Sequence, residues 1–286
     1  MAEIKQVVVV GAGTMGSQIA LQTALSGRYS VRLVDAERRQ LERATEQNEK
    51  LVARAVERGR LDSEQGRKAL AAVESTSDLG KAVQDADLVI EAVFEDFDVK
   101  REVFERADRA APEHAIIASN SSSIAISRLA AATSRPDRCC NMHFFHPVTV
   151  MQLCEVVEGP QTSPQTVETA MAFVRSIDRT PVHVRKEIHG FIVNRILFAA
   201  LEEAVRLYRG GYAGFEDIDT AVRSGLNWPM GPFQLMDFSG IDVIVGVMAD
   251  RHRLGEGPDA DELLKDKVER GELGRKAKKG FYEYGG

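Results

Sequence analysis

The residues best suited to moving a proton are His143 and Glu155. An imidazole changes charge near neutral pH, and a carboxylate beside it fixes the ring tautomer and stabilises the imidazolium, so such a pair makes a general base for a hydroxyl group. The spacing of two residues in a sequence does not establish that their side chains meet. A histidine followed by Phe144 and Phe145 is also, taken alone, more often a packed structural residue.

A glycine-rich segment indicates a second chemistry, the binding of a dinucleotide. Gly11, Gly13 and Gly16 follow an apolar run and precede a helix-compatible stretch. The first glycine permits a tight turn, the second lets the backbone approach a pyrophosphate, and the third lets the helix pack on the strand. N–H groups at the start of the helix then face the anion. The residues expected to bind the cofactor here are Gly11, Gly13, Thr14, Met15 and Gly16.

Asp35 indicates which dinucleotide binds. It ends a second β-rich segment, 19 residues after Gly16. A carboxylate in this position accepts hydrogen bonds from the adenosine ribose hydroxyls and repels a 2′-phosphate, so NAD is expected rather than NADP. Arg38 and Arg39 keep NADP open as an alternative, because either guanidinium could reach a 2′-phosphate instead of lying in solvent.

These residues need a sheet to position them, and the apolar segments predict one. Short β-rich runs alternate with helical stretches, which is typical of an α/β fold with a Rossmann-type doubly wound parallel sheet. We expect this domain over residues 1–187, with a helical hairpin inserted at about 36–73, and an all-helical domain over 188–286. The expected strands are 7–10, 30–34, 87–93, 115–118, 140–144, 152–157 and 180–185.

Composition narrows the class of protein. The 286 residues carry 37 basic and 43 acidic side chains, a net charge of −6, which argues against a nucleic-acid partner. No apolar run approaches the roughly 18 residues of a membrane span, and the first residues lack a secretory pattern. Cys139, Cys140 and Cys154 form no CxxC pair, so we expect no disulfide, no zinc site and a cytoplasmic location. We also expect no metal at His143 and His146, because positions i and i+3 on a strand face opposite sides.

Five motifs occur in order along the chain, and together they resemble the L-3-hydroxyacyl-CoA dehydrogenase family, which includes 3-hydroxybutyryl-CoA dehydrogenases. The similarity runs from Val7 to Tyr284. The motifs are Asn120-Ser121-Ser122-Ser123, His143-Phe144-Phe145-x-Pro147, Met151-x-Leu153-x-Glu155-Val156-Val157, Gly190-Phe191-Ile192-Val193-Asn194-Arg195 and Pro229-Met230-Gly231-Pro232-Phe233-x-Leu235-x-Asp237.

The resemblance implies acid/base chemistry on an acyl-CoA. His143 would take the proton of the 3-hydroxyl while a hydride leaves C3 for the nicotinamide, giving a 3-ketoacyl thioester, and Glu155 would orient His143. Ser122 would donate a hydrogen bond to the reacting oxygen, and Asn194 would help to hold the substrate. Without the resemblance, Ser122 would be interpreted as a helix N-cap and Asn194 as a capping or interhelical hydrogen bond.

The resemblance also implies further binding residues. Arg58 would contact the CoA part of the substrate, because a guanidinium offers a cation there. For the charged residues near the cofactor, and for Arg58, the alternative is an exposed position on a helix face. A homodimer formed through the helical domain is expected, although apolar helix faces fit a monomer's core equally. The residues expected beside the cofactor are Glu95, Lys100, Asn120, His146 and Lys276.

Three features depart from the family pattern. His146 stands where relatives usually carry Asn or Ser, and Leu51 replaces a serine of the hairpin. The segment before Gly190 lacks the usual proline, which leaves the interdomain hinge less restricted in φ. These departures bear on the acyl substrate more than on the reaction. The alternatives are a related NAD-dependent 3-hydroxyacid dehydrogenase for a non-CoA substrate of the gulonate or carnitine type, and a non-catalytic dinucleotide-binding structural protein.

Overall fold

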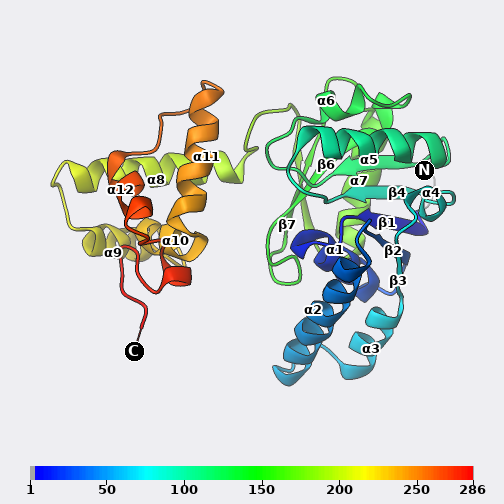
Figure 1. The fold of residues 1–286 in the computed structure, drawn as a ribbon, viewed down its shortest axis with the longest axis horizontal. Coiled ribbons are helices and arrows are strands. Elements are labelled where there is room, and N and C mark those ends of the chain that lie inside the picture. Colours follow the sequence, from blue (N-terminus) through cyan, green and yellow to red (C-terminus); the bar gives the residue numbers. More distant parts are fainter. Residues whose placement is uncertain (1–3, 286) are drawn as a thin grey trace. The chain divides into compact units, whose positions relative to one another are not determined.

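The computed structural model describes residues 4–285, and the chain divides into two compact units after Phe191 (Figure 1). The predicted boundary, between 187 and 188, lies four residues earlier. The segment in between still packs on the first unit. The Glu187 carboxylate accepts a hydrogen bond from the backbone N–H of Ser127 at 2.6 Å, and Phe191 is buried beside Val157 and Val184. Glu187 therefore anchors the link in which the usual proline is missing.

An eight-stranded sheet forms the centre of the first unit and confirms the predicted Rossmann-type α/β class. Its order is β3-β2-β1-β4-β5-β6-β7-β8. Every neighbouring pair is parallel except β6 and β7, so the expectation of a fully parallel sheet was wrong at that pair. The strands are β1 (Gln6–Val10), β2 (Ser30–Val34), β3 (Val73–Thr76), β4 (Leu88–Glu91), β5 (Ile116–Ser119), β6 (Cys139–Phe144), β7 (Leu153–Val157) and β8 (Thr180–Val184).

Strand β3 was not predicted. The hairpin was expected to continue to Val73, whereas its second helix ends at Ala71 and Val73 begins a strand that pairs with β2 at the edge of the sheet. Only one of the four residues of β3 is apolar, and two of the four are exposed. Such a segment has no alternating apolar pattern from which a strand could be predicted.

Helices cover both faces of the sheet, which explains the uninterrupted apolar run of β1. The helices of this unit are α1 (Thr14–Leu25), α2 (Arg38–Glu57), α3 (Ser63–Ala71), α4 (Leu79–Ala82), α5 (Phe97–Ala110), α6 (Ile126–Ala130) and α7 (Pro164–Ser176), with a 3₁₀ turn at Pro136–Arg138. Val7 and Val9 belong to one apolar cluster with α1, and Val8 and Val10 to another with α5. All four side chains are therefore buried, as in strands that are covered on both sides.

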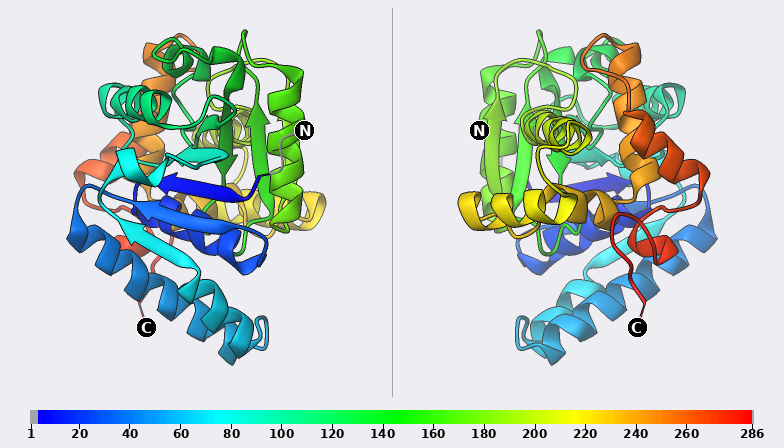
Figure 2. Two further views of the ribbon diagram at one scale, coloured as in Figure 1. Left: turned by 90° about the vertical axis from the view of Figure 1, so that its right-hand side faces the viewer. Right: turned by 90° about the vertical axis from the view of Figure 1, so that its left-hand side faces the viewer.

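The predicted helical hairpin is present as α2 and α3, which lie side by side and extend away from the sheet (Figures 1 and 2). The Asp62 side chain starts α3 by accepting hydrogen bonds from the backbone N–H groups of Glu64 and Gln65, both at 2.9 Å. The second helix of the hairpin therefore begins at a capped residue, directly after the turn.

The second unit is built from helices, as predicted. They are α8 (Val193–Arg209), α9 (Phe215–Leu226), α10 (Pro232–Ser239), α11 (Ile241–Arg253) and α12 (Glu262–Glu269), with a 3₁₀ turn at Arg275–Ala277. Two buried carboxylates fix the segment after α12. Asp237 accepts hydrogen bonds from the backbone N–H groups of Phe281 and Tyr282, and Asp219 accepts one from the Tyr282 hydroxyl. This segment is thus held to α9 and α10.

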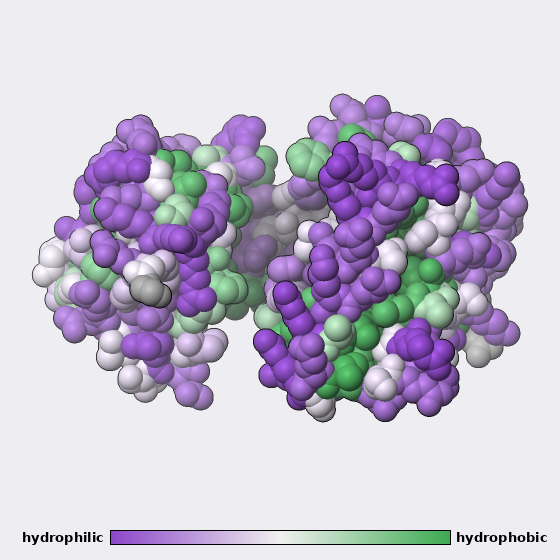
Figure 3. Space-filling model, turned by 60° about the horizontal axis from the view of Figure 1, so that its bottom comes forward, coloured by the Kyte–Doolittle hydropathy of each residue, from purple (hydrophilic) through white to green (hydrophobic). Residues whose placement is uncertain are grey.

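The face of each unit that Figure 3 shows is mostly polar. Figure 3 shows hydrophilic residues over most of the visible face, with hydrophobic residues gathered in the recesses between them. Within residues 4–285 no single helix is long and apolar enough to cross a membrane, and one pair of helices bent by 98°, α10 with α11, meets the length and composition criteria together. Both helices of that pair contribute buried residues to the core of the second unit, among them Phe233 and Met248.

Candidate active site

The glycine segment makes a tight turn from β1 into α1, and a different physical reason favours glycine at each of its three glycine positions. Gly11 has a φ of +106°, and a Cβ there would lie 2.5 Å from the carbonyl oxygen of Ala92. A Cβ on Gly16 would lie 1.9 Å from the carbonyl oxygen of Gly11, so the helix approaches the turn only because that side chain is missing. A Cβ on Gly13 meets nothing within 4 Å. The backbone at Gly13 therefore borders open space at a helix N-terminus, which fits a pyrophosphate.

A cleft of about 790 Å³ opens beside this turn, and Asp35 lies in its wall. The Asp35 carboxylate accepts hydrogen bonds from the backbone N–H groups of Ala12 at 2.8 Å and Glu37 at 2.9 Å. A carboxylate has about four acceptor sites, so both oxygens can still accept from ribose hydroxyls. Neither Arg38 nor Arg39 lines the cleft, and both are exposed. Gly11, Gly13, Thr14, Met15 and Val93 also line it.

Replacement of Asp35 tests the cofactor preference. Asp35→Ala is expected to weaken NADH binding by at least about tenfold and NADPH binding less, because the loss of the carboxylate removes the acceptor for the ribose but also the repulsion of a 2′-phosphate. Fluorescence titration with each reduced cofactor measures both dissociation constants. Glu42→Ala, which removes an exposed carboxylate of α2 outside this cleft, is the matched control. A larger loss for NADPH would show that the ribose contact is misassigned.

The structure brings His143 and Glu155 together. They are direct partners in the antiparallel pairing of β6 with β7, and Nδ1 of His143 lies 2.9 Å from Oε2 of Glu155. Glu155 is fully buried, and 8% of His143 is exposed. The rings of Phe145 and Phe191 pack on the imidazole with centroids 4.5 and 5.5 Å away. Because Nδ1 is held by the carboxylate, Nε2 is the nitrogen left to exchange a proton.

The loop after β5 carries the predicted Asn120 and Ser122 toward the same edge of the sheet. Oδ1 of Asn120 accepts a hydrogen bond from the backbone N–H of Phe144 at 2.9 Å, which ties this loop to the residue next to His143. The helix-cap interpretation of Ser122 is wrong, because Ser121 accepts the hydrogen bond from the N–H of Ile124 at 2.9 Å. Ser122 is half-buried, and its hydroxyl makes no hydrogen bond to residues 4–285.

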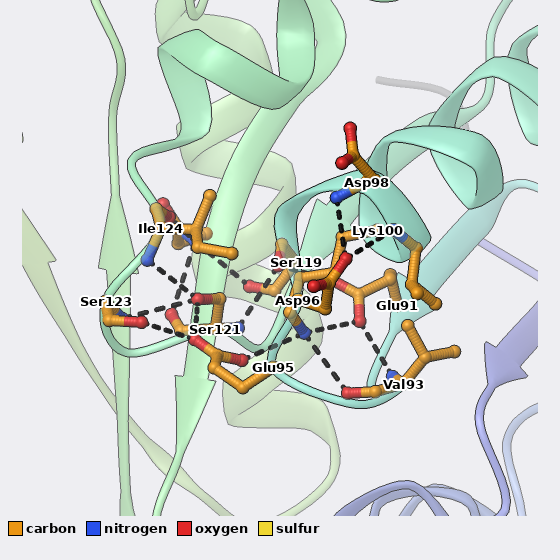
Figure 4. A network of polar contacts seen from close by, with 12 residues as sticks. Glu91, Val93, Glu95, Asp96, Asp98, Lys100, Ser119, Ser121, Ser123 and Ile124 are labelled. Carbon is orange, nitrogen blue, oxygen red and sulfur yellow. Dashed lines mark hydrogen bonds and ion pairs between the residues drawn. The ribbon is translucent and has the colours of Figure 1, made fainter. Parts of the chain in front are cut away.

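Two of the residues expected near the cofactor, Glu95 and Lys100, form an ion pair behind this loop (Figure 4). Lys100 is buried, with 1% exposed, so the alternative of an exposed helix face is wrong for it. The Glu95 side chain is 43% exposed. Burial raises its pKa, but the Lys100 charge and hydrogen bonds from Ser121 and Ser123 outweigh burial, so the pKa of Glu95 lies below its usual value. Glu95 is therefore ionised at neutral pH.

The remaining predicted residues lie in different parts of the chain. His146 is exposed and precedes a cis peptide bond to Pro147. Arg58 is exposed at the C-terminal end of α2. In the second unit, Asn194 lies in the first turn of α8, and Lys276 pairs with Asp242 at 2.5 Å.

Comparison with known proteins decides the family. Residues 6–188 match the family model for the "3-hydroxyacyl-CoA dehydrogenase, NAD binding domain", and residues 190–284 match the model for the "3-hydroxyacyl-CoA dehydrogenase, C-terminal domain". The chain belongs to the 3-hydroxyacyl-CoA dehydrogenase family. It is therefore an oxidoreductase whose cofactor is NAD, in agreement with the glycine turn and Asp35.

Several relatives resemble this member of the family over its whole length. It is 39% identical to the human mitochondrial hydroxyacyl-coenzyme A dehydrogenase, with 98% of this chain and 91% of the relative covered. It is 39% identical to a probable 3-hydroxybutyryl-CoA dehydrogenase of Bacillus subtilis, with 99% and 98% covered. The crystal structure of the (S)-3-hydroxybutyryl-CoA dehydrogenase of Ralstonia eutropha is similar with a TM-score of 0.92 at 36% identity, over 99% of this chain and 100% of that one. A solved diketoreductase has a TM-score of 0.90 at 34% identity, over the same shares of the two chains.

The hairpin contributes to a second cleft, and of the residues that line it Arg58 and Leu51 were singled out from the sequence. The cleft has a volume of about 590 Å³, and Arg54, Arg60 and Arg179 line it together with Arg58 and Leu51. The i, i+4 spacing of Arg54 and Arg58 was a signal that could have predicted the former, because such residues share a helix face. No sequence pattern marks Arg179, which follows α7 and is buried.

The cysteines do not contribute a nucleophile to this family member. Burial raises the pKa of the Cys139 thiol to about 12 and raises the pKa values of Cys140 and Cys154 as well, so all three stay protonated and unreactive at neutral pH. Over the described residues 4–285, no group of three or more His, Cys, Asp and Glu side chains could hold a metal ion.

Proposed function

We propose that this protein is an NAD-dependent (S)-3-hydroxyacyl-CoA dehydrogenase for short acyl chains, interconverting substrates such as 3-hydroxybutyryl-CoA with the 3-ketoacyl-CoA. The observation that carries the proposal is the His143–Glu155 pair, 2.9 Å apart on strands of the same sheet that carries the glycine turn. The carboxyl edge of such a sheet is where a dinucleotide and its substrate meet.

Different residues of this chain have different roles in the reaction. The chemistry that NAD supplies when bound is a hydride acceptor. The hydrogen on C3 of the substrate leaves with both electrons of its C–H bond. Nε2 of His143 accepts the proton of the 3-hydroxyl, and Glu155 stabilises the imidazolium through Nδ1. Ser122 donates a hydrogen bond to the reacting oxygen, and Asn194 holds the substrate. In the reducing direction His143 returns the proton to the carbonyl oxygen.

The arginine-lined cleft supports a CoA substrate. Arg54, Arg58 and Arg60 bring three guanidinium groups to its wall, and guanidinium groups suit the phosphates of CoA. The cleft also offers the apolar side chains of Leu51 and Leu61. A flexible chain with phosphates at one end fits such a combination of charged and apolar surface.

Removal of the cationic wall should separate substrate binding from chemistry. The double substitution Arg54→Ala with Arg58→Ala is expected to raise the KM for acetoacetyl-CoA by about tenfold with kcat nearly unchanged, because uniform binding energy is lost. Steady-state kinetics at saturating NADH measure both constants. Arg67→Ala removes an exposed arginine of the same hairpin outside the cleft and serves as control. An unchanged KM in the double variant would place CoA elsewhere.

A second candidate is a reductase of small non-CoA compounds. It is favoured by the similarity to the solved diketoreductase, an enzyme described as acting on dicarbonyl compounds. Substrates of the gulonate or carnitine type are also small compounds without CoA. The two candidates differ in whether the CoA moiety is recognised.

A single assay separates the candidates. The loss of NADH absorbance is measured with acetoacetyl-CoA and with free acetoacetate, in parallel with NADPH. Fast oxidation of NADH that requires the thioester supports the proposed function. Turnover of acetoacetate at a similar rate favours the second candidate, and measurable NADH binding without turnover of any substrate would favour a structural dinucleotide-binding protein.

We also propose that the protein is a cytoplasmic homodimer joined through its helical unit. Large apolar side chains are exposed on that unit, including Ile196, Leu226, Phe238, Val243 and Leu254, and a second copy would cover them. Light scattering at micromolar concentration gives the mass directly. A mass of about 31.5 kDa, that of one chain, would contradict the dimer.

A further inference from the structure

Val148 lies in the connection between β6 and β7, and two side chains satisfy its backbone polar groups. Only 1% of the residue is exposed, and it belongs to no helix or strand. Oε1 of Gln18 accepts a hydrogen bond from the Val148 N–H at 2.9 Å, and Nε of Arg179 donates one to the Val148 carbonyl oxygen at 2.9 Å. Buried backbone groups outside secondary structure need such partners, so these two side chains fix the connection.

Gln22 holds the same arginine from α1. Gln18 and Gln22 are about one helical turn apart, so they share a face of α1, and both are buried. Oε1 of Gln22 accepts a hydrogen bond from Nη2 of Arg179 at 2.6 Å, and its Nε2 donates one to the carbonyl oxygen of Ile177 at 2.8 Å. Arg179 is thereby bonded to both α1 and the connection. We call Gln18, Gln22 and Arg179 the Val148 clamp.

The connection that this clamp fixes forms part of the wall of the arginine-lined cleft. Thr149, Val150 and Gln152, which follow Val148 closely, line that cleft. Gln18, which lies among the described residues 4–285, lines neither that cleft nor the one beside the glycine turn. A substitution at Gln18 therefore reaches a ligand in the arginine-lined cleft through the residues that Gln18 holds, and not by direct contact.

We infer that the Val148 clamp positions the connection between β6 and β7 against α1, so that the residues after Val148 complete the site for the CoA part of the substrate. The members of the clamp are thus positioning residues. This inference rests on the proposed function, which places CoA in the arginine-lined cleft. The pairing of β6 with β7 keeps the catalytic pair together independently of the clamp. Loss of the clamp should therefore weaken substrate binding and leave the chemical step largely intact.

Gln18→Leu tests the inference, because it removes the acceptor for the Val148 N–H with a side chain of similar size. The KM for acetoacetyl-CoA is expected to rise by about tenfold, while kcat and the NADH dissociation constant change by less than about threefold. With the acetoacetyl thioester of N-acetylcysteamine, kcat/KM should change by less than about twofold, since this truncated substrate lacks the phosphates of CoA. Steady-state kinetics and fluorescence titration of NADH measure these constants.

Two further variants of α1 serve as controls. Thr23→Val removes a buried hydroxyl that donates within its own helix, to the carbonyl oxygen of Ile19 at 2.8 Å, and should leave all constants unchanged. Gln18→Glu keeps an oxygen acceptor beside the Arg179 guanidinium and should restore the KM to within about threefold of the wild-type value. Equal KM increases in Gln18→Leu and Thr23→Val would overturn the inference, and a Glu variant as weak as the Leu variant would contradict the role of the hydrogen bond.

Hydrogen exchange of the Val148 N–H gives a readout that does not depend on turnover. This N–H is buried and bonded to Gln18, so Gln18→Leu should accelerate its exchange by about tenfold or more. Unchanged exchange, or a normal KM despite faster exchange, would overturn the inference. Slow exchange in the wild-type protein together with equal use of acetoacetyl-CoA and the truncated thioester would contradict the proposed function and leave the clamp in place.

A variant of the next helical turn keeps the inference testable if Gln18→Leu does not fold. Gln22→Met removes the acceptor of the Arg179 guanidinium. Faster exchange of the Val148 N–H, with a higher KM for acetoacetyl-CoA and not for the truncated thioester, would support the inference. A higher KM with unchanged exchange would show that Gln22 contacts the substrate directly and would overturn it.

Discussion

His143→Ala is expected to lower kcat in both directions by about 100-fold or more, with NADH affinity nearly unchanged. Nε2 of His143 is the only nitrogen of the ring left to carry the proton, since Nδ1 is bonded to the buried Glu155. The glycine turn that binds the cofactor belongs to β1 and α1 and does not depend on this ring. Steady-state kinetics and fluorescence titration of NADH measure the two effects separately.

The same sheet supplies a matched control. Nε2 of His183, on β8, lies 2.7 Å from Oε2 of Glu158, so the protein contains another histidine–carboxylate pair of the same kind. Both residues of that pair are about one-third exposed. His183→Ala should keep nearly full activity. Comparable losses in the two variants would mean that His143 acts through stability, and near-normal turnover of His143→Ala would eliminate it as the acid/base.

Two glycines of the same turn should respond differently to alanine. Gly16→Ala should lower the stability of the protein, whereas Gly13→Ala should weaken the binding of NADH. Gly16→Ala places a methyl group 1.9 Å from a backbone oxygen, so α1 must move away from the turn, and the free energy of unfolding should fall by about 3 kcal/mol. Gly13→Ala meets no atom within 4 Å, and the free energy of unfolding should change by no more than about 1 kcal/mol. Urea denaturation without cofactor gives both values.

Cofactor affinity then completes the comparison. Although Gly13→Ala leaves the fold intact, its methyl group fills the open space beside the helix N-terminus, and NADH should bind at least about 100-fold more weakly because the backbone can no longer approach the pyrophosphate. Normal NADH affinity in stable Gly13→Ala would place the pyrophosphate elsewhere. Normal stability of Gly16→Ala would show that the contact between helix and turn is looser than described.

Much of the fold could be predicted because its signals are local. The four valines of β1, the spacing of the glycines and the amphipathic helices of the second unit each depend on neighbouring residues, and these elements occur where expected. β3 could not be predicted, since one apolar residue on a sheet edge leaves no pattern. The reversed direction of β7 was missed although a signal for it exists, because the connection over residues 145–152 holds no helix and parallel strands need a crossover of about a dozen residues or more.

The candidate site, too, could be predicted only where its signals are local. Resemblance to the family suggested the types of residues, but the contact between His143 and Glu155 depends on the register of β6 with β7. The contacts of Ser121 and Lys100 depend on the packing of β4, α5 and the loop after β5, which are close only in the fold. Arg179 reaches its cleft from the end of α7 by the same kind of long-range approach. Such contacts leave no trace in the spacing of a single sequence.

The antiparallel pair has a consequence for how this enzyme can diversify. Residues 145–152 connect β6 to β7, and Thr149, Val150 and Gln152 of this connection line the arginine-rich cleft. Insertions or deletions there would reshape that cleft without changing which residues face each other on the strands. A single insertion inside either strand would turn its half of the catalytic pair to the opposite face of the sheet. Changes in the connection between β6 and β7 can thus alter which substrate binds, while the paired strands keep the residues that carry out the reaction.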